Sequence, residues 1–285
     1  SPGASDVDKG RPIYDGDLPM PTPIALTIAG SASSGGAGVQ ADIKAMSANG
    51  AFAASVITAI TAQNTTSVTR VHEVPVDVVL AQIEAVLSDL HVQAIKLGML
   101  FSAPIIDAVA KGLVGFSAPI VVDPVMISKS GDALLHSSAV DSMICKALPL
   151  ATLLTPNLPE AACLLGTSQA HRSADIIAQG QQLLAMGPKA VLMKGGHADG
   201  DICTDYLIDA TGVVATLAAP RVQTRNTHGT GCTYSAAIAA QLDKGQDLHG
   251  AVTTAHSYLQ AAIKAADQLS IGRGHGPVHH FHGQW

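Results

Sequence analysis

The sequence predicts an α/β fold in which a mostly parallel sheet has helices on both faces. Short apolar runs alternate along the chain with longer segments of helical periodicity, which is typical of strand–helix–strand crossover units. Hydrophobic residues make up 47% of the 285 residues, but aromatic residues only 3%, so aliphatic side chains and alanine must fill the core. Sheet strands covered on both faces use such a composition. One large domain is expected, because α/β folds often run this far as a single unit.

Residues 1–22 are predicted to be a flexible tail outside this domain. They contain four prolines with scattered Asp and Gly and no hydrophobic period. Because the sequence starts without methionine, processing or a cloning remnant is an alternative origin for this segment. The predicted domain therefore covers residues 23–285.

The first strand–helix unit starts the pattern. An apolar strand over 24–30 ends in the loop Ser31–Gly38, which is rich in serine and glycine, and a helix follows over 39–48. Further short apolar runs predict strands, and the segments between many of them predict helices. The strands are 53–61, 94–100, 120–125, 152–155, 190–194, 204–208 and 213–217. The helices are 76–90, 104–113, 138–148, 159–165, 174–186, 231–242 and 248–269.

Charge and composition exclude several partners. The net charge of −6, without a dense basic block, argues against nucleic acid. No apolar run reaches the roughly 18 residues of a membrane span, and no secretory signal is recognised, so we expect a cytoplasmic enzyme or binding protein without a membrane partner. The four cysteines are far apart and form no C-x-x-C pair, so they are expected to be reduced thiols.

The stretch Asn226–Thr233 predicts an anion site. Its glycines and small hydroxyl residues lead directly into an alanine-rich helix, and the N-terminus of a helix favours phosphate. Cys232 lies in the first turn, where the same field is expected to lower its pKa toward neutrality. These features predict a phosphate site with a built-in base or nucleophile. The alternative is an ordinary helix start with a buried cysteine.

Polar or glycine residues also follow six of the predicted strands. They are Gly30, Gln63-Asn64, Gly98-Met99, Asp123, Asn157 and Lys194–His197. The carboxyl ends of parallel strands meet at one edge of the sheet, where ligands bind in such folds. The sequence therefore predicts that these residues converge on one site.

Three of the charged residues fit phosphoryl transfer, and each has a structural alternative. Asp123, between a β-branched strand and a proline, is either a turn former or a Mg²⁺ partner. Glu160 is either a metal partner or a first-turn carboxylate that satisfies the helix dipole. Lys194 ends an apolar strand and needs an anion, either a nucleotide phosphate or a structural carboxylate.

Three other segments have weaker signals. The Gly35–Gly38 loop lacks the Walker A ending and the dinucleotide spacing, so we expect it to close over a small substrate. The segment 126–131 is predicted to be a lid or a plain surface loop. His279, His280 and His282 are expected to serve packing or to lie on the surface, rather than to bind a metal.

Taken together, the motifs resemble those of hydroxymethylpyrimidine kinase/phosphomethylpyrimidine kinase of thiamine biosynthesis. The resemblance covers about residue 23 to the C-terminus. It rests on TIAGS (27–31), SGGAGVQAD (34–42), VITA and AQN (56–59 and 62–64), KLGML (96–100), DPVM (123–126), SGD (130–132), LTPNLPEA (154–161), KGGH (194–197), GTGCT (229–233) and GPVHHF (276–281).

This resemblance implies a ribokinase-like fold and two successive ATP-dependent phosphorylations. The first acts on the hydroxymethyl group of 4-amino-5-hydroxymethyl-2-methylpyrimidine, and the second makes the diphosphate. A homodimer is expected. The implied roles are Cys232 as catalytic base; Gly229, Thr230 and Gly231 as anion hole; Gln63, Met99, Thr61 and Gly30 at the pyrimidine, with a less direct part for Asp42; Lys194 and Asn157 at the ATP phosphates; and Glu160 and Asp123 at Mg²⁺.

One position departs from the family pattern, and three other functions stay open. The first glycine loop of the family usually reads Gly-Ser-Asp, whereas this chain has Ala32. Pyridoxal kinase, or a dual kinase, is the nearest alternative, although Gln63 favours the aminopyrimidine. A sugar kinase is disfavoured, because Cys232 stands where those enzymes have aspartate. The lost carboxylate also leaves open a ligand-binding regulator without catalysis.

Overall fold

The computed structural model describes residues 22–126, 134–135, 137–197 and 200–285. Within these residues, nine strands form one sheet in the order β3-β2-β1-β4-β5-β6-β7-β8-β9. The predicted tail and the predicted lid lie almost entirely outside them. The strands are β1 Ile24–Ala32, β2 Phe52–Gln63, β3 Val68–Glu73, β4 Ala94–Leu97, β5 Ile120–Val122, β6 Leu153–Leu154, β7 Ala190–Met193, β8 Ile202–Asp209 and β9 Gly212–Pro220.

The central strands are parallel and the two edges are antiparallel. Strands β2, β1, β4, β5, β6 and β7 pair in parallel, whereas β3 pairs with β2, and β8 with β7 and β9, in the antiparallel sense. The predicted mostly parallel sheet is confirmed. The sequence analysis missed β3, because this edge strand is largely solvent-exposed and therefore has no continuous apolar run.

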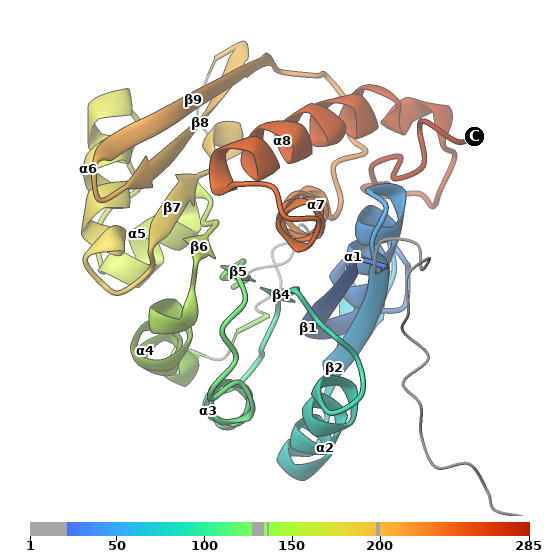
Figure 1. The fold of residues 1–285 in the computed structure, drawn as a ribbon. Helices are drawn as coiled ribbons and strands as arrows, with labels where there is room; N and C mark the ends of the chain where they lie inside the picture. Colours follow the sequence, from blue (N-terminus) through green and yellow to red (C-terminus); the bar gives the residue numbers. More distant parts are fainter. Residues whose placement is uncertain (1–21, 127–133, 136, 198–199) are drawn as a thin grey trace, which may run out of the picture.

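Helices cover both faces of the sheet (Figure 1). Three helices lie on one face: α1 Gly38–Ala48, α7 Thr230–Asp243 and α8 Leu248–Lys264, and α7 contacts both of the others. The other face carries α2 Val76–Leu87, α3 Ala103–Gly112, α4 Val140–Ser142, α5 Leu158–Leu165 and α6 Ser173–Leu184. The predicted three-layer arrangement is confirmed.

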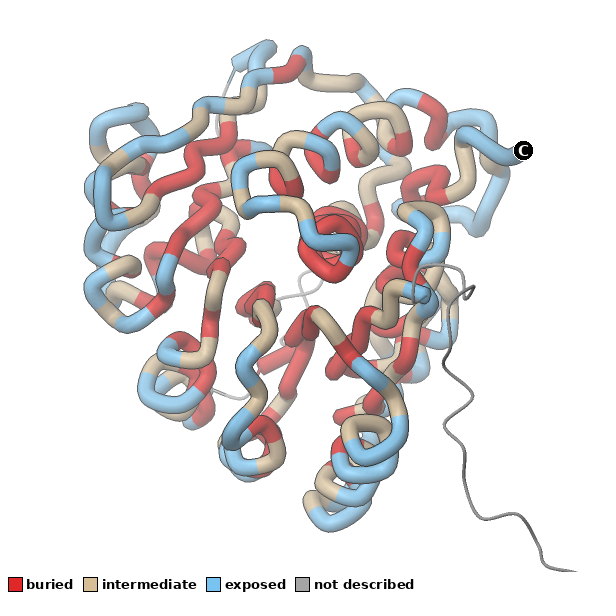
Figure 2. Tube along the Cα trace, in the orientation of Figure 1, coloured by how far each residue is buried: buried red, intermediate tan, exposed pale blue. Residues whose placement is uncertain are grey.

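The two faces have separate cores because strand side chains alternate. Leu26 and Ile28 on β1 belong to the core under α2 and α3, whereas Ala25 belongs to the core under α1 and α7. Helix α7 is buried at every position from Thr233 to Asp243, as the red tube in Figure 2 shows. A helix that is apolar on all sides is buried on all sides, and its alanines let α1 and α8 pack closely against it.

Most predicted elements agree with the structure to within three residues at each end. The exceptions are two helices. The predicted helix 248–269 ends at Lys264 and is followed by a 3₁₀ turn at Ala266–Gln268. In place of 138–148 the chain forms α4, a π turn at Met143–Ala147 and a 3₁₀ turn at Leu148–Leu150. Pro149 cannot donate a backbone hydrogen bond, which favours the irregular ending.

The C-terminal segment packs onto the helices that carry the glycine loop. His280 Nε2 lies 3.0 Å from Thr233 Oγ1 on α7, and its backbone oxygen accepts from the Tyr258 hydroxyl on α8 at 2.7 Å. His279 and His280 are both buried, which fits the packing interpretation of these histidines. This contact ties the end of the chain to the start of α7.

We predict that His280 makes folding pH-dependent. Burial, together with the charges of Lys44 and His279, lowers the pKa of His280 from an ordinary 6.5 to about 4. The unfolded chain therefore takes up a proton below pH 6.5 that the folded chain takes up only near pH 4. The neutral His280 therefore contributes its full share to the free energy of unfolding above pH 6.5. This contribution is lost as the pH falls toward 4, and the loss is roughly 2 kcal/mol at about pH 5.

His280→Gln tests this prediction by denaturant unfolding at about pH 7.5 and pH 5. Glutamine can still hydrogen-bond to Thr233 but does not titrate. The advantage of the wild type in free energy of unfolding should shrink by roughly 2 kcal/mol at the lower pH. An advantage that is the same at both pH values would contradict the prediction.

Candidate functional site

The glycine loop and the start of α7 form the centre of the site. Helix α7 begins at Thr230, one residue before the predicted start at 231, with Gly229 as its N-cap in the left-handed region at φ 76°. A Cβ at Gly229 would lie 1.9 Å from the backbone oxygen of Gly36, so the two glycine loops touch backbone to backbone. The first N–H groups of a helix have no partner within the helix, so this end suits an anion.

An ion pair between Asp123 and Lys194 lies directly against this loop. Lys194 Nζ donates to Asp123 Oδ1 at 2.7 Å, and a Cβ at Gly231 would be 3.4 Å from that nitrogen and 3.5 Å from Asp123 Oδ2. Although burial opposes it, the charge of Lys194 lowers the pKa of Asp123, and Asp123 in turn raises that of Lys194. Of the two partners expected for Lys194, the structural carboxylate is present; the phosphate contact stays a prediction.

Asn157 and Glu160 form a capping box at the start of α5. The Asn157 side chain accepts from the Glu160 N–H, and the Glu160 carboxylate accepts from the Asn157 N–H, both at 2.8 Å. Glu160 is therefore a first-turn carboxylate of a helix, which is one of the two roles expected for it. Burial raises the pKa of Glu160 to about 7, against the opposing charge of Lys194. The metal role of Glu160 stays a prediction.

Cys232 occupies the expected first turn, but its predicted pKa was wrong. The residue is half-buried. Burial raises the pKa of Cys232 to about 11, and the carboxylates of Asp42 and Asp123 add to this effect. The charge of Lys96 and the N–H of Gly38 act in the opposite direction and do not compensate. The helix start alone did not reveal these neighbouring groups.

The predicted pyrimidine residues lie beside the glycine loop. Gly30 leaves room for Met99, whose Cε would be only 2.6 Å from a Cβ there. The Thr61 hydroxyl lies 3.3 Å from Gln63 Oε1. Gln63 Nε2 in turn lies 3.5 Å from Nε2 of His228, the residue that precedes Gly229. The predicted acceptor residues and the predicted anion loop are thus neighbours.

Asp42 lies behind this site. Its side chain is fully buried, and its oxygens accept from Thr27 at 2.6 Å and from Lys96 at 2.9 and 3.0 Å. Both carboxylate oxygens are therefore engaged by the protein. This geometry fits the less direct part expected for Asp42.

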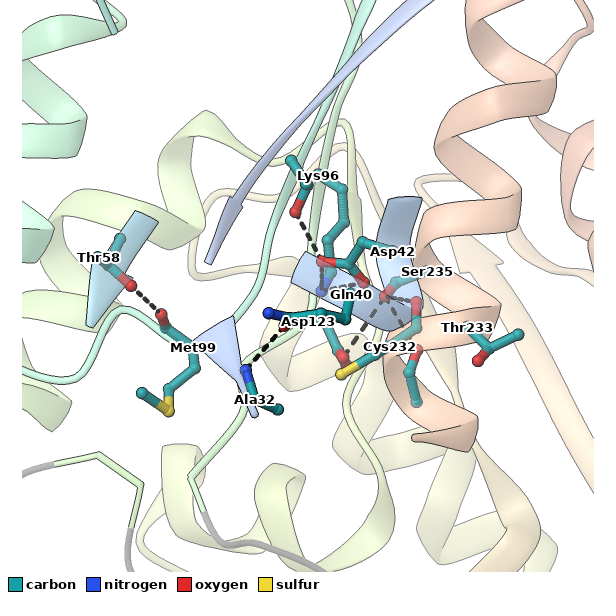
Figure 3. A network of polar contacts seen from close by, with 12 residues as sticks. Ala32, Gln40, Asp42, Thr58, Lys96, Met99, Asp123, Cys232, Thr233 and Ser235 are labelled. Atoms are coloured by element: carbon teal, nitrogen blue, oxygen red, sulfur yellow. Dashed lines mark hydrogen bonds and ion pairs between the residues drawn. The ribbon is translucent and has the colours of Figure 1, made fainter. Parts of the chain in front are cut away.

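The end of β1 at Ala32 is held by a glutamine. Gln40 accepts from the Ala32 N–H at 2.8 Å and donates to the Ser31 hydroxyl at 2.7 Å (Figure 3). On the other side, the Ser33 hydroxyl donates to the backbone oxygen of Gln63 at 2.8 Å. Without a carboxylate at position 32, the chain still fixes the loop between α1 and the end of β2.

Sequence analysis gave no role to Lys96, Gln40 or His228. A signal for Lys96 was present, since a lysine inside the apolar run 94–100 needs a buried anion, as was argued for Lys194. For His228, the only indication in the sequence is that it directly precedes the glycine loop. Gln40 has no signal, because a glutamine on a helix is ordinary.

The geometry agrees with comparisons to known proteins. The family model for phosphomethylpyrimidine kinase matches residues 32–279. The chain belongs to this family. It is 54% identical to hydroxymethylpyrimidine/phosphomethylpyrimidine kinase of Rhizobium meliloti, over 93% of this chain and 99% of the relative. The Escherichia coli protein of the same name is 48% identical, over 92% and 98%. The family predicted from the motifs is confirmed.

Solved structures confirm the ribokinase-like fold. Phosphomethylpyrimidine kinase from Clostridium difficile is 42% identical, with a TM-score of 0.74, over 84% of this chain and 99% of that one. Pyridoxal kinase from Bacillus subtilis in an ADP complex is 33% identical, with a TM-score of 0.84, over 91% and 97%. The pyridoxal kinase has the higher TM-score but the lower sequence identity. The fold alone therefore does not show whether the acceptor is a pyrimidine or pyridoxal.

We predict that Gly229→Ala disables the site. The new Cβ would overlap the Gly36 oxygen, so one loop must move, and a displacement of about 1 Å near the chemistry can cost about 10²-fold in rate. We expect kcat to fall by about 10²-fold or more, measured by ADP release.

Gly245→Ala is the matched control. Gly245 also has a positive φ, at 82°, but nothing lies within 4 Å of its Cβ position. This variant should lose about 1 kcal/mol of stability and keep its kcat. Equal losses of kcat in the two variants would show that backbone strain, and not the contact between the loops, is responsible.

Proposed function

We propose that this chain phosphorylates 4-amino-5-hydroxymethyl-2-methylpyrimidine with ATP and then phosphorylates the resulting monophosphate, as a step of thiamine biosynthesis. The observation that carries the proposal is the 54% identity, over nearly the full length, to a relative with this double name. A relative from Geobacter sulfurreducens, named a thiamine biosynthesis bifunctional protein, is 42% identical over 54% of its own length. The use of ATP is supported by a pyridoxal kinase structure with ADP and by others with AMP-PCP.

The glycine loop receives the transferred phosphoryl group in this proposal. In this proposal the donors are the N–H groups of Gly229, Thr230 and Gly231, and donors fixed in advance stabilise the charge that develops during transfer. The Thr230 N–H makes a long bond of 3.4 Å to the Thr227 backbone oxygen, which the phosphoryl group would replace. Lys194, which lies against Gly231, and Asn157 act on the ATP phosphates. The capping bond uses the oxygen of the Asn157 side chain, so the amide nitrogen of that side chain is the donor.

Asp123 and Glu160 would hold Mg²⁺ with the nucleotide. Among the described residues, no group of three or more His, Cys, Asp and Glu is placed to bind a metal ion. This arrangement fits Mg²⁺, which commonly uses one or two carboxylates together with substrate phosphates and water. When bound, the ion neutralises charge on the phosphates. Burial raises the pKa of Glu160 to about 7, and a bound Mg²⁺ would favour the ionised carboxylate.

The acceptor lies on the opposite side of the glycine loop. The amide of Gln63 both donates and accepts, as an aminopyrimidine requires. Met99, Thr61 and Gly30 line the flat face of the ring. His228 connects Gln63 to the glycine loop, so the acceptor hydroxyl and the phosphoryl group are brought together.

Cys232 serves as the base for the acceptor hydroxyl. A primary alcohol is far less acidic than a thiol, so the proton moves to sulfur only as the bond to phosphorus forms. Because the pKa of Cys232 is raised to about 11, the sulfur is mainly a neutral thiol near neutral pH and must lose its proton before it can act; once formed, its thiolate is a stronger base than that of an ordinary cysteine. In a loose transition state, its position contributes as much as its basicity.

A pyridoxal kinase activity is the second candidate. Pyridoxal kinase from Staphylococcus aureus, solved with AMP-PCP and pyridoxal, has a TM-score of 0.84 and 33% identity to this chain, over 92% of this chain and 95% of that one. Both acceptors carry a hydroxymethyl group on a flat nitrogen heterocycle. The third candidate, a regulator that binds without catalysis, rests on Ala32.

A product assay separates the three candidates. The purified protein is incubated with ATP, Mg²⁺ and either the pyrimidine alcohol or pyridoxal, and chromatography resolves monophosphate from diphosphate. We expect both pyrimidine products, a higher kcat/KM for the pyrimidine than for pyridoxal, and loss of turnover with EDTA. Tight pyrimidine binding without ADP release would refute the kinase proposal and support the regulator.

A homodimer and a cytoplasmic location are further parts of the proposal. All four cysteines are unpaired thiols, as expected in a reducing compartment. Separately, none of the described helices is long and apolar enough to span a membrane.

We predict that Cys232→Ala lowers kcat by about 10²-fold or more, the contribution typical of a general base. Cys145→Ala is the control, because Cys145 is exposed on a π turn of the opposite layer. It should keep wild-type turnover. Near wild-type turnover of Cys232→Ala would remove the assignment.

A further inference from the structure

A strained turn follows directly after Met99. Phe101 has a φ of 67°, and within the part of the chain that the structure describes no other non-glycine residue has a positive φ. The Ser102 N–H donates to the Leu100 backbone oxygen at 2.8 Å, which closes a three-residue turn around Phe101. Such a turn with positive φ is strained, and a bulky side chain rarely adopts it. A glycine would adopt it freely, so contacts of the Phe101 ring must offset the strain.

The ring of Phe101 packs against a small apolar cluster that is separate from the two cores. We call it the acceptor-side cluster. Its buried members are Ala59, Met99 and Leu134, and the partly buried side chains packed against them are Val68, Val71, Phe101 and Val125. Phe101 is itself only half-buried. A half-buried ring contributes less to stability than a fully buried one, so the strain points to a role in the neighbouring site.

The acceptor-side cluster lies beside the residues predicted to hold the pyrimidine. In the register of β2 and β3, Thr61 pairs with Val71, and Gln63 pairs with Val68. Residues that pair directly across antiparallel strands share one face of the sheet. Both valines therefore lie next to the polar side chains of the predicted acceptor site, and Met99 belongs to the cluster and to that site at once.

The position of Met99 depends on its surroundings, because methionine is unbranched and has three rotatable bonds. Its backbone oxygen accepts from the Thr58 hydroxyl at 2.7 Å (Figure 3). Its methyl group lies against Gly30, where a Cβ would be 2.6 Å from Met99 Cε. The acceptor-side cluster supplies further contacts, and Phe101 adds its ring to them. Loss of this ring would give the Met99 side chain more freedom to move.

We propose that Phe101 is a positioning residue that sets the selectivity for the acceptor: the strained turn holds its ring in the acceptor-side cluster, which keeps Met99 against Gly30 and the site narrow. The inference rests on the proposed function and names the residue that separates its two candidate acceptors. Pyridoxal carries one ring substituent more than the pyrimidine alcohol, so it needs the wider site. A difference of one methylene in an apolar site changes relative rates by about 10–200-fold.

The test compares the full-length wild type with Phe101→Ala and Phe101→Gly, using ATP, Mg²⁺ and either acceptor. In both variants we expect the ratio of kcat/KM for the pyrimidine to that for pyridoxal to fall by about tenfold. The KM for the pyrimidine should rise, while kcat stays within about twofold and the KM for ATP is unchanged, because a wall contact binds ground state and transition state alike. An unchanged ratio, or equal losses for both acceptors, would overturn the proposal.

The two variants lack the same ring and differ in backbone strain. Glycine adopts the φ of Phe101 freely and alanine does not, so Phe101→Gly should melt about 2–4 °C above Phe101→Ala. The glycine variant also keeps the test possible if the alanine variant does not fold. A glycine variant that melts no higher than a folded alanine variant would show that the turn is not strained, and would overturn the proposal.

Phe116→Ala is the matched control. Phe116 is also half-buried, but it packs against the core under α2 and α3. Its loss should lower the melting temperature and leave the ratio of the two kcat/KM values within about twofold of wild type. A tenfold fall of this ratio in Phe116→Ala would show that loss of any such ring changes selectivity, and would overturn the proposal.

Calorimetric binding of each acceptor decides the role of Phe101 without turnover. If the wild type binds the pyrimidine but does not phosphorylate it, the proposed function is refuted, and the two Kd values still report the selectivity. In Phe101→Gly the preference for the pyrimidine over pyridoxal should then fall by about tenfold. A wild-type preference in this variant would overturn the role of Phe101, and a wild type that binds neither acceptor would overturn both proposals.

Discussion

The site depends on one close backbone contact, between Gly36 in the loop after β1 and Gly229 at the start of α7. No side chain separates the two segments, so the loop from the first crossover unit lies directly on the loop from the last helix pair. This contact fixes the acceptor side, through β1 and β2, relative to the N-terminus of α7. It also brings His228 to Gln63. Residues from opposite ends of the sequence thereby form one site.

Two ion pairs lie close to this contact between the loops. The carboxyl ends of β5 and β7 supply Asp123 and Lys194, which pair beneath Gly231, and the Lys96–Asp42 pair lies beside them. Each of these four charges has a neighbour of opposite sign, which allows ionised groups to exist under the loop proposed to bind an anion. Capping of α5 by Asn157 and Glu160 places a further carboxylate within reach of Lys194.

Much of the fold and the location of the site could be predicted from the sequence. Apolar periodicity marks the parallel strands, and the parallel order then determines that Asp123, Asn157 and Lys194 meet at one edge. Features set by tertiary environment could not be predicted. The pKa of Cys232 depends on its burial and on Asp42 and Asp123, which are remote in sequence. The edge strand β3 has no continuous apolar run, because none of its six residues is fully buried. The partner of Lys96 was likewise decided by packing.

The burial of α7 on all sides has a consequence for how such enzymes diversify. A helix enclosed by alanine contacts with α1 and α8 tolerates few larger side chains, so the half of the molecule that is proposed to bind phosphate is confined to a narrow range of sequences. Gln63, at the end of β2, is only half-buried and is less constrained. Changes of acceptor during evolution are therefore expected to accumulate at the end of β2, while the half proposed to bind the donor is inherited intact.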